Sequence, residues 1–345
     1  MTHYNPHVMS DGYTRRDCLM FLTAAALPHV RVDASAPAAA AGSSKPLRGA
    51  FMILSTPYTA SGAVDWDDLA GELVFCDRCG AQGVVWPQGS SGVARLTKDE
   101  RMRGMEVLAK AVQGKRTALV LGVQGKDTTE MIEYARSAEA LAPDAMIAMP
   151  PSVATSLEDY RTYFRALAKV TSRPVIVQTT GGAPSLTPPV DLIVDLAREL
   201  PNFGYVKEES EPLVERMKAE IRHRPQMKTI FGAGFALNWL YEMRLGLDGV
   251  MTGMAMYADV MAKLWSLHER HQLEALRDLY SKFLLMRNLN DHVPGADLYV
   301  MHKRGVFKTL VTRTAAGPKT LSFSPDEIAE IEYRFEALKP YILNS

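Results

Sequence analysis

The sequence predicts an α/β protein, a closed (β/α)₈ TIM barrel with a helical extension at its C-terminal end. Three observations indicate this fold class. Eight short apolar runs recur along the chain, a helix-like segment follows each of them, and the pattern after about residue 259 is helical only. Apolar runs that alternate with helices indicate a parallel sheet covered on both faces, and eight such units suit a closed barrel. An open doubly wound sheet is the alternative.

The apolar runs mark the expected strands. They cover residues 50–55, 83–86, 117–123, 144–150, 174–179, 203–207, 228–232 and 248–253. Between them lie amphipathic segments such as residues 157–170, where apolar side chains recur every three or four positions on one helix face. Asp65 and Thr97 precede two of these segments, and short oxygen-bearing side chains at such positions are typical of helix N-caps.

The chain length of 345 residues accommodates a barrel and an extension. We expect the barrel over residues 47–258 and the helical extension over residues 259–345. The extension contains a long helical pattern, then a break at Pro294-Gly295, then further helical segments.

Residues 1–42 have a different character. Arg15 and Arg16 precede an apolar run over residues 18–27, which is shorter than the roughly 20 residues that span a bilayer. A small-residue stretch, Ala34-Ser35-Ala36, follows as a candidate cleavage site. This arrangement predicts a twin-arginine-like export signal and linker, so that a mature periplasmic or secreted protein would begin near residues 37–45. The alternative is a disordered tail in which the arginine pair occurs by chance.

Composition excludes several classes of partner and site. Lys plus Arg and Asp plus Glu each number 39, and this balance argues against nucleic acid or an anionic membrane surface as the main partner. Three cysteines are too few for a disulfide framework. Cys76 and Cys79 form a single CxxC pair without a second pair or a histidine cluster. We therefore expect packing thiols rather than a redox pair or a metal site.

Active sites of such barrels lie at the C-terminal ends of the strands. Lys207 is the only lysine at those predicted ends. An amine buried there has a lowered pKa, and a neutral amine can attack a carbonyl carbon and form a Schiff base. The alternative is a structural lysine that pairs with Glu208 or Glu209 or extends to solvent.

The segment Gly89–Gly92, with the sequence GSSG, follows one strand and precedes a helix. Glycines let a backbone approach a ligand closely, and N–H groups at a helix start favour an anion. The hydroxyls of Ser90 and Ser91 could hold a carboxylate there. Alternatively, the segment is an ordinary turn.

Four stretches carry a resemblance to a known family. GSSG after GVVW, YVKE at 205–208, LGLDGVMTGMA at 245–255 and TPYTASGAVDWDDL at 56–69 resemble the dihydrodipicolinate synthase and N-acetylneuraminate lyase family, in the right order and spacing. The resemblance runs from about residue 47 to near the C-terminus. It implies a barrel with C-terminal helices and class I aldolase-type lyase chemistry on pyruvate or another 2-oxo acid. It also implies no metal and no organic cofactor, and a homo-oligomer, either a dimer or a tetramer.

The same resemblance assigns roles to individual residues. Lys207 becomes the catalytic Schiff-base lysine, and Ser90 and Ser91 bind the carboxylate of the 2-oxo acid. Gly232 and Met251 are expected to line the pocket.

The sequence also departs from the family pattern. The tyrosine that usually ends the fifth strand is replaced by Gln178, which is neither an acid nor a base. Four further positions lack the usual arginine, tyrosine pair and glutamate. They are Ala183, Pro151, Ser152 and Val93.

These departures affect the proton relay and the second substrate. Tyr58, Glu208, or a water held by Gln178 and Thr179 are candidates to replace the relay. The chain is expected to be a divergent lyase of aldolase, synthase or dehydratase type, not a true dihydrodipicolinate synthase. Its co-substrate would be an aldehyde without a carboxylate, apolar or aromatic. The alternative function is a catalytically impaired 2-oxo acid binding or sensing protein.

Overall fold

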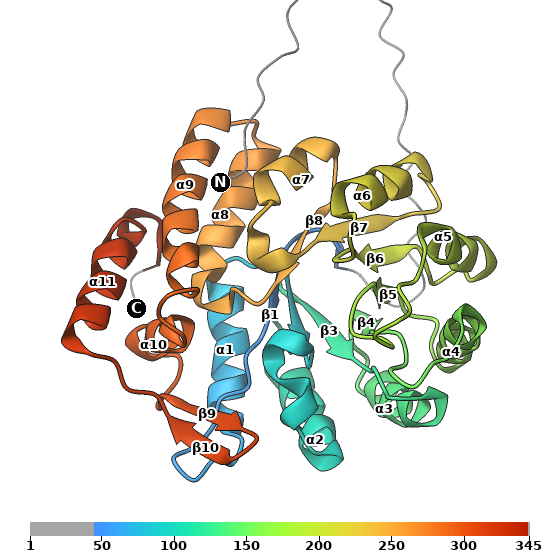
Figure 1. The fold of residues 1–345 in the computed structure, drawn as a ribbon, viewed down its shortest axis with the longest axis horizontal. Helices are drawn as coiled ribbons and strands as arrows, with labels where there is room; N and C mark the ends of the chain where they lie inside the picture. Colours follow the sequence, from blue (N-terminus) through green and yellow to red (C-terminus); the bar gives the residue numbers. More distant parts are fainter. Residues whose placement is uncertain (1–44, 344–345) are drawn as a thin grey trace, which may run out of the picture. The chain divides into compact units, whose positions relative to one another are not determined.

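The computed structural model describes residues 45–343 and closes eight parallel strands into a barrel (Figure 1). The strands are β1 Gly49–Ile53, β2 Gly83–Trp86, β3 Ala118–Gly122, β4 Ala145–Ala148, β5 Val175–Gln178, β6 Tyr205–Lys207, β7 Thr229–Gly232 and β8 Gly249–Thr252. Each strand pairs with the next, and β8 pairs with β1. The predicted TIM barrel is confirmed, and the open sheet is excluded.

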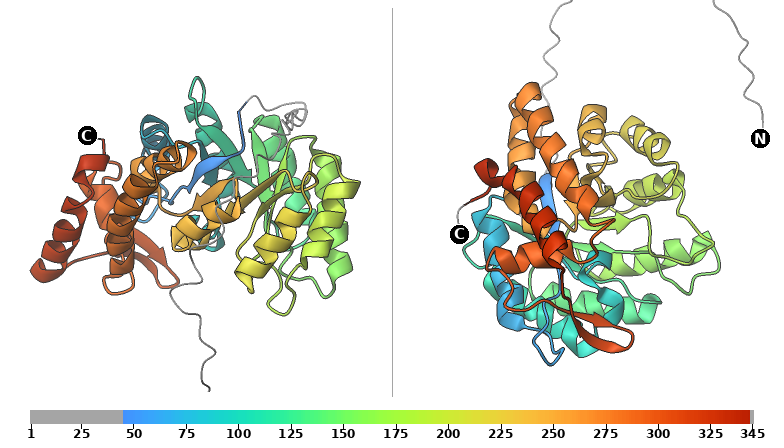
Figure 2. Two further views of the ribbon diagram at one scale, coloured as in Figure 1. Left: turned by 90° about the horizontal axis from the view of Figure 1, so that it is seen from above. Right: turned by 60° about the vertical axis from the view of Figure 1, so that its left-hand side comes forward.

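Eight helices surround the barrel (Figure 1 and Figure 2). They are α1 Trp66–Arg78, α2 Lys98–Ala111, α3 Thr128–Ala140, α4 Leu157–Val170, α5 Val190–Glu199, α6 Leu213–Arg222, α7 Trp239–Leu245 and α8 Ala258–Glu269. The Asp65 side chain accepts hydrogen bonds from the first backbone N–H groups of α1, and Thr97 forms a capping box with Glu100 at α2. Both N-caps predicted from the sequence are confirmed.

The interior of the barrel is apolar below its C-terminal rim, by which we mean the carboxyl ends of the strands. Phe51, Ile176, Phe231 and Met251 belong to this interior cluster, and the half-buried Tyr205 packs against it. Side chains along a strand alternate between the two faces. Lys207, two positions after Tyr205, therefore faces the barrel interior at the rim.

The C-terminal extension packs beside α1 and α8 (Figure 1). It comprises α9 Leu273–Leu289, α10 Ala296–Lys303, β9 Val311–Thr314, β10 Gly317–Thr320 and α11 Pro325–Glu336. The antiparallel hairpin β9–β10 was not predicted, because its short strands are mostly polar and carry no apolar run. The expected boundary at residues 258 and 259 falls at the start of α8, which packs against β1.

The predicted export signal, residues 1–42, lies outside the described residues. Within residues 45–343, no helix combines the length and the apolar character needed to cross a membrane. In the same part of the chain, Cys76 and Cys79 are buried free thiols, and burial raises the pKa of both, that of Cys79 to about 12. Over the described residues 45–343, no group of three or more side chains could hold a metal ion.

Candidate active site

Lys207 ends β6 at the C-terminal rim and is 3% exposed. Burial lowers the pKa of its amine from the 10.5 of a lysine in water, and the charge of Glu209 opposes this shift. The amine Nζ lies 3.0 Å from Oε1 of Glu209. The site thus contains a desolvated amine with a lowered pKa and one carboxylate in direct contact with it.

The sequence alone indicates Glu209 only as a possible partner for a structural lysine. Its Oε2 accepts a hydrogen bond of 2.8 Å from the Thr180 hydroxyl, which in turn accepts one of 3.2 Å from the Gln178 side-chain amide. Its backbone N–H donates to the Thr179 hydroxyl over 2.9 Å. Two loops that follow neighbouring strands therefore hold the carboxylate with one oxygen on the amine.

Glu208 faces away from the amine. Its carboxylate is fully buried and lies 3.0 Å from the Arg216 guanidinium on α6. It also accepts hydrogen bonds of 2.7 Å each from the Thr179 hydroxyl and from the backbone N–H of Ser210. Neighbouring Glu220 has a pKa well above its usual range, because of burial and then the Glu208 charge. Glu208 thus anchors α6 to the loop after β6.

The serine turn, Gly89–Gly92, begins as a single 3-10 turn and ends on Gly92 at a φ of 72°, a left-handed conformation that favours glycine. The buried Ser91 hydroxyl donates to the Leu54 carbonyl over 2.6 Å and accepts from the Gln88 backbone over 3.1 Å, so it supports the turn. Ser90 is exposed at the rim. Its side chain lies against Gly253, where an added Cβ would come within 2.7 Å of the Ser90 hydroxyl.

The four remaining sequence-predicted residues occupy different environments. Gln178 on β5 pairs in register with Lys207 and is buried beside it. Thr179 contacts the loop after β6 through its hydroxyl. Met251 is fully buried in the interior cluster below the rim. A Cβ at Gly232 would lie 2.0 Å from a carboxylate oxygen of Glu242, so this face of the glycine is turned toward α7.

Glu242 has a testable effect on stability. Burial raises its pKa from 4.5 to about 7, and its Oε2 has no hydrogen-bond partner among residues 45–343. Between these two pKa values the folded state keeps a proton that the unfolded chain releases, so the free energy of unfolding falls as pH rises. We expect Glu242→Gln to be more stable than wild type above pH 7, by about 3 kcal/mol, and to lose this advantage near pH 5.

Chemical denaturation of both proteins between pH 5 and pH 9 measures that difference. A gap between the two free energies of unfolding that stays constant over this range would show that Glu242 does not titrate as described.

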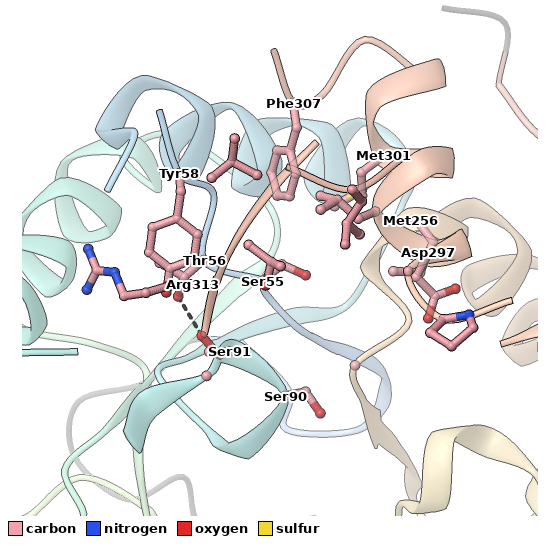
Figure 3. A pocket seen from close by; sticks show the side chains of 18 of the residues that line it. Ser55, Thr56, Tyr58, Ser90, Ser91, Met256, Asp297, Met301, Phe307 and Arg313 are labelled. Carbon is pink, nitrogen blue, oxygen red and sulfur yellow. Dashed lines mark hydrogen bonds between the residues drawn. The ribbon is translucent and has the colours of Figure 1, made fainter. Parts of the chain in front are cut away.

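A cavity of about 540 Å³ lies between the rim and the C-terminal extension (Figure 3). Ser90, Ser91 and Gly253 line it on the barrel side, Arg95, Asp297 and Arg313 are its charged lining residues, and about half of its lining side chains are apolar. These include Phe235, Met256, Leu298, Met301 and Phe307. Tyr58 stands in its wall with the Arg313 guanidinium 4.6 Å from its ring, and Lys207 is not among the lining residues. The serine turn therefore borders this cavity.

Comparisons with known proteins agree with the barrel fold. The sequence model of the dihydrodipicolinate synthetase family matches residues 46–314, which confirms the resemblance seen in the motifs. A 4-hydroxy-tetrahydrodipicolinate synthase of Chlorobaculum parvum is 26% identical over 250 residues, covering 72% of this chain and 83% of that protein.

Two solved structures have the same fold at low identity. The structure of the 4-hydroxy-tetrahydrodipicolinate synthase of Methylacidiphilum fumariolicum SolV matches with a TM-score of 0.74 at 18% identity, covering 86% of this chain and 97% of its own. That of the chloride-inhibited dihydrodipicolinate synthase of Acinetobacter baumannii, complexed with pyruvate, matches with a TM-score of 0.72 at 20% identity, covering 86% and 100%.

Proposed function

Because the chain belongs to the dihydrodipicolinate synthetase family, we propose that it is a Schiff-base-forming lyase that acts on pyruvate or another 2-oxo acid. The observation that carries this proposal is the Lys207 amine, which is buried at the C-terminal rim, has a lowered pKa and contacts a carboxylate. Such an amine is a nucleophile toward the C2 carbonyl of a 2-oxo acid.

The proposed reaction uses two parts of the rim. Lys207 condenses with C2, and the serine turn receives the carboxylate of the substrate. The resulting iminium withdraws electrons from C3, so a bond to C3 can break or form. No metal or organic cofactor is needed for these steps, because the iminium itself is the electron sink.

The second substrate is proposed to be an apolar or aromatic aldehyde without a carboxylate. Ala183, where the family pattern has an arginine, is a small buried side chain. Gln178 replaces the usual tyrosine, which further argues against activity as a true dihydrodipicolinate synthase. The cavity beside the serine turn, which Phe235, Met256 and Phe307 help to line, offers room for such a partner. Condensation of pyruvate with a panel of these aldehydes tests the proposal, and no product from any member would refute it.

A 2-oxo acid binding or sensing protein is the competing function. The replacement of the tyrosine by Gln178 favours it, because an amide cannot transfer protons. The contact between Glu209 and Lys207 weighs against it, because binding alone does not require a titratable group on the amine. Measured turnover separates the two functions, since a binding protein can also form an imine.

Borohydride trapping tests the Schiff base directly. The protein is incubated with pyruvate or with other 2-oxo acids, reduced, and weighed intact by mass spectrometry. We expect a mass gain equal to the reduced adduct in wild type and none in Lys207→Ala. The absence of an adduct with every acid would leave Lys207 as a structural residue.

We further propose that residues 1–42 direct export and that the mature protein is a homo-oligomer. The arginine pair and the apolar run support export, and family membership supports the oligomer. Fractionation of cells that express wild type or Arg15→Lys/Arg16→Lys tests export. We expect the variant to remain inside the cell and wild type to be exported.

A further inference from the structure

We infer that Glu209 is the catalytic residue that transfers protons during imine formation and hydrolysis at Lys207. The inference rests on the proposed function and assigns a group to the proton relay that Gln178 cannot provide. Two candidates from the sequence lie elsewhere: Tyr58 is part of the wall of the cavity, and Glu208 pairs with Arg216 on α6.

Position is the first support for this role. Glu209 Oε1 lies 3.0 Å from the Lys207 amine, within the range over which a proton passes directly between two groups. It is the only carboxylate that forms an ion pair with Lys207 within residues 45–343. Once C2 of the substrate is bonded to this nitrogen, a group in contact with the nitrogen also lies next to the oxygen on C2.

Orientation is the second support. The Thr180 hydroxyl donates to Oε2 over 2.8 Å and the Thr179 hydroxyl holds the Glu209 backbone N–H over 2.9 Å. Gln178 donates to Thr180 over 3.2 Å, so its amide acts as a positioning group. These bonds leave Oε1 directed at the amine, and preorganised geometry of this kind is what general acid–base catalysis requires.

Solvent access is the third support. The Glu209 side chain is 23% exposed, whereas that of Lys207 is 4% exposed. The carboxylate is therefore more accessible to solvent than the amine that it contacts. It can exchange protons with water between turnovers, which the amine alone cannot do efficiently.

The proton balance of the step follows from this placement. Glu209 accepts a proton from the Lys207 ammonium, and the free amine attacks C2 of the 2-oxo acid. A second proton moves from the nitrogen to the former carbonyl oxygen, which gives a neutral carbinolamine. Glu209 then returns its proton to that oxygen, which leaves as water, and the iminium forms beside a carboxylate anion. One water is released, and the net charge of the pair and substrate is unchanged.

The test measures the rate at which the adduct forms. Wild type and Glu209→Gln are mixed with pyruvate and quenched with borohydride at increasing times, and the reduced adduct is quantified by intact mass. Removal of a general acid–base group costs about 10²–10⁴-fold, so we expect the rate in Glu209→Gln to fall by at least 10²-fold. Glu211→Gln, an exposed carboxylate on the same loop, is the matched control and should retain the wild-type rate.

Chemical rescue separates a catalytic role from a structural one. Glu209→Ala leaves a partly exposed gap beside the amine, and added formate or acetate should restore part of the rate in proportion to its concentration. If wild type forms the adduct and Glu209→Gln forms it at the same rate, the catalytic role of Glu209 is refuted and the proposed function stands. A slow Glu209→Ala variant that neither acid rescues would also overturn that role. No adduct in wild type would instead refute the proposed function.

Discussion

Lys207→Met is expected to abolish imine formation and turnover while leaving the folded state at least as stable as that of wild type. The lowered pKa of Lys207 means that the folded state binds this proton less tightly than the unfolded chain does. Below the folded-state pKa the buried ammonium therefore destabilises the fold, and methionine removes that cost while keeping the length of the side chain. Glu209, which is 23% exposed, can be hydrated without its partner.

Turnover, borohydride trapping and chemical denaturation on the same preparation measure these effects together. Lys228→Met is the matched control, because Lys228 is another lysine whose pKa is lowered by burial, and it precedes β7 at the opposite end of the barrel. The control should retain the adduct. A Lys207→Met protein that is markedly less stable than wild type would show that the amine is a structural partner of Glu209.

Arg216→Met is expected to cost about 3–5 kcal/mol of unfolding free energy, because it leaves a buried carboxylate without its counter-charge. Glu208 is fully buried, and the Arg216 guanidinium lies 3.0 Å from it. Arg216 also donates a 2.9 Å hydrogen bond to the Pro188 carbonyl, so its loss loosens the segment before α5 as well. The free energy of unfolding from urea titration measures the effect.

Lys218→Met, an exposed position on the same helix, should change that free energy by about 0.5 kcal/mol or less. Adding Glu208→Gln to Arg216→Met should recover part of the loss, because the unpaired charge is then absent. Equal stability of Arg216→Met and Lys218→Met would contradict the description of this pair as a buried ion pair.

Much of the barrel was predictable because its strands are buried on both faces and read as continuous apolar runs. Residues 203–207 marked β6, and the structure places that strand at Tyr205–Lys207. The hairpin β9–β10 was not predictable in this way. Its residues, such as Arg313 and Lys319, are polar, and the hairpin is held by contacts distant in sequence, including the bidentate pairing of Arg313 with Glu100.

The candidate site was predictable only in part. The rule that active sites lie at strand ends led to Lys207 and the serine turn. It could not indicate which of Glu208 and Glu209 faces the amine, because that depends on how the chain turns after β6. The hydrogen bonds from Thr179 and Thr180 set this turn, and they come from the neighbouring loop. Likewise, the close approach of the Glu242 carboxylate to Gly232 depends on how α7 packs against β7.

The most direct test of Lys207 as the Schiff-base lysine is to locate the trapped adduct. Wild-type protein is reduced with borohydride in the presence of pyruvate, digested, and mapped by peptide mass spectrometry. We expect a single modified peptide, the one containing Lys207, with the added mass on that lysine. An adduct on any other lysine, or no adduct with any 2-oxo acid, would contradict it.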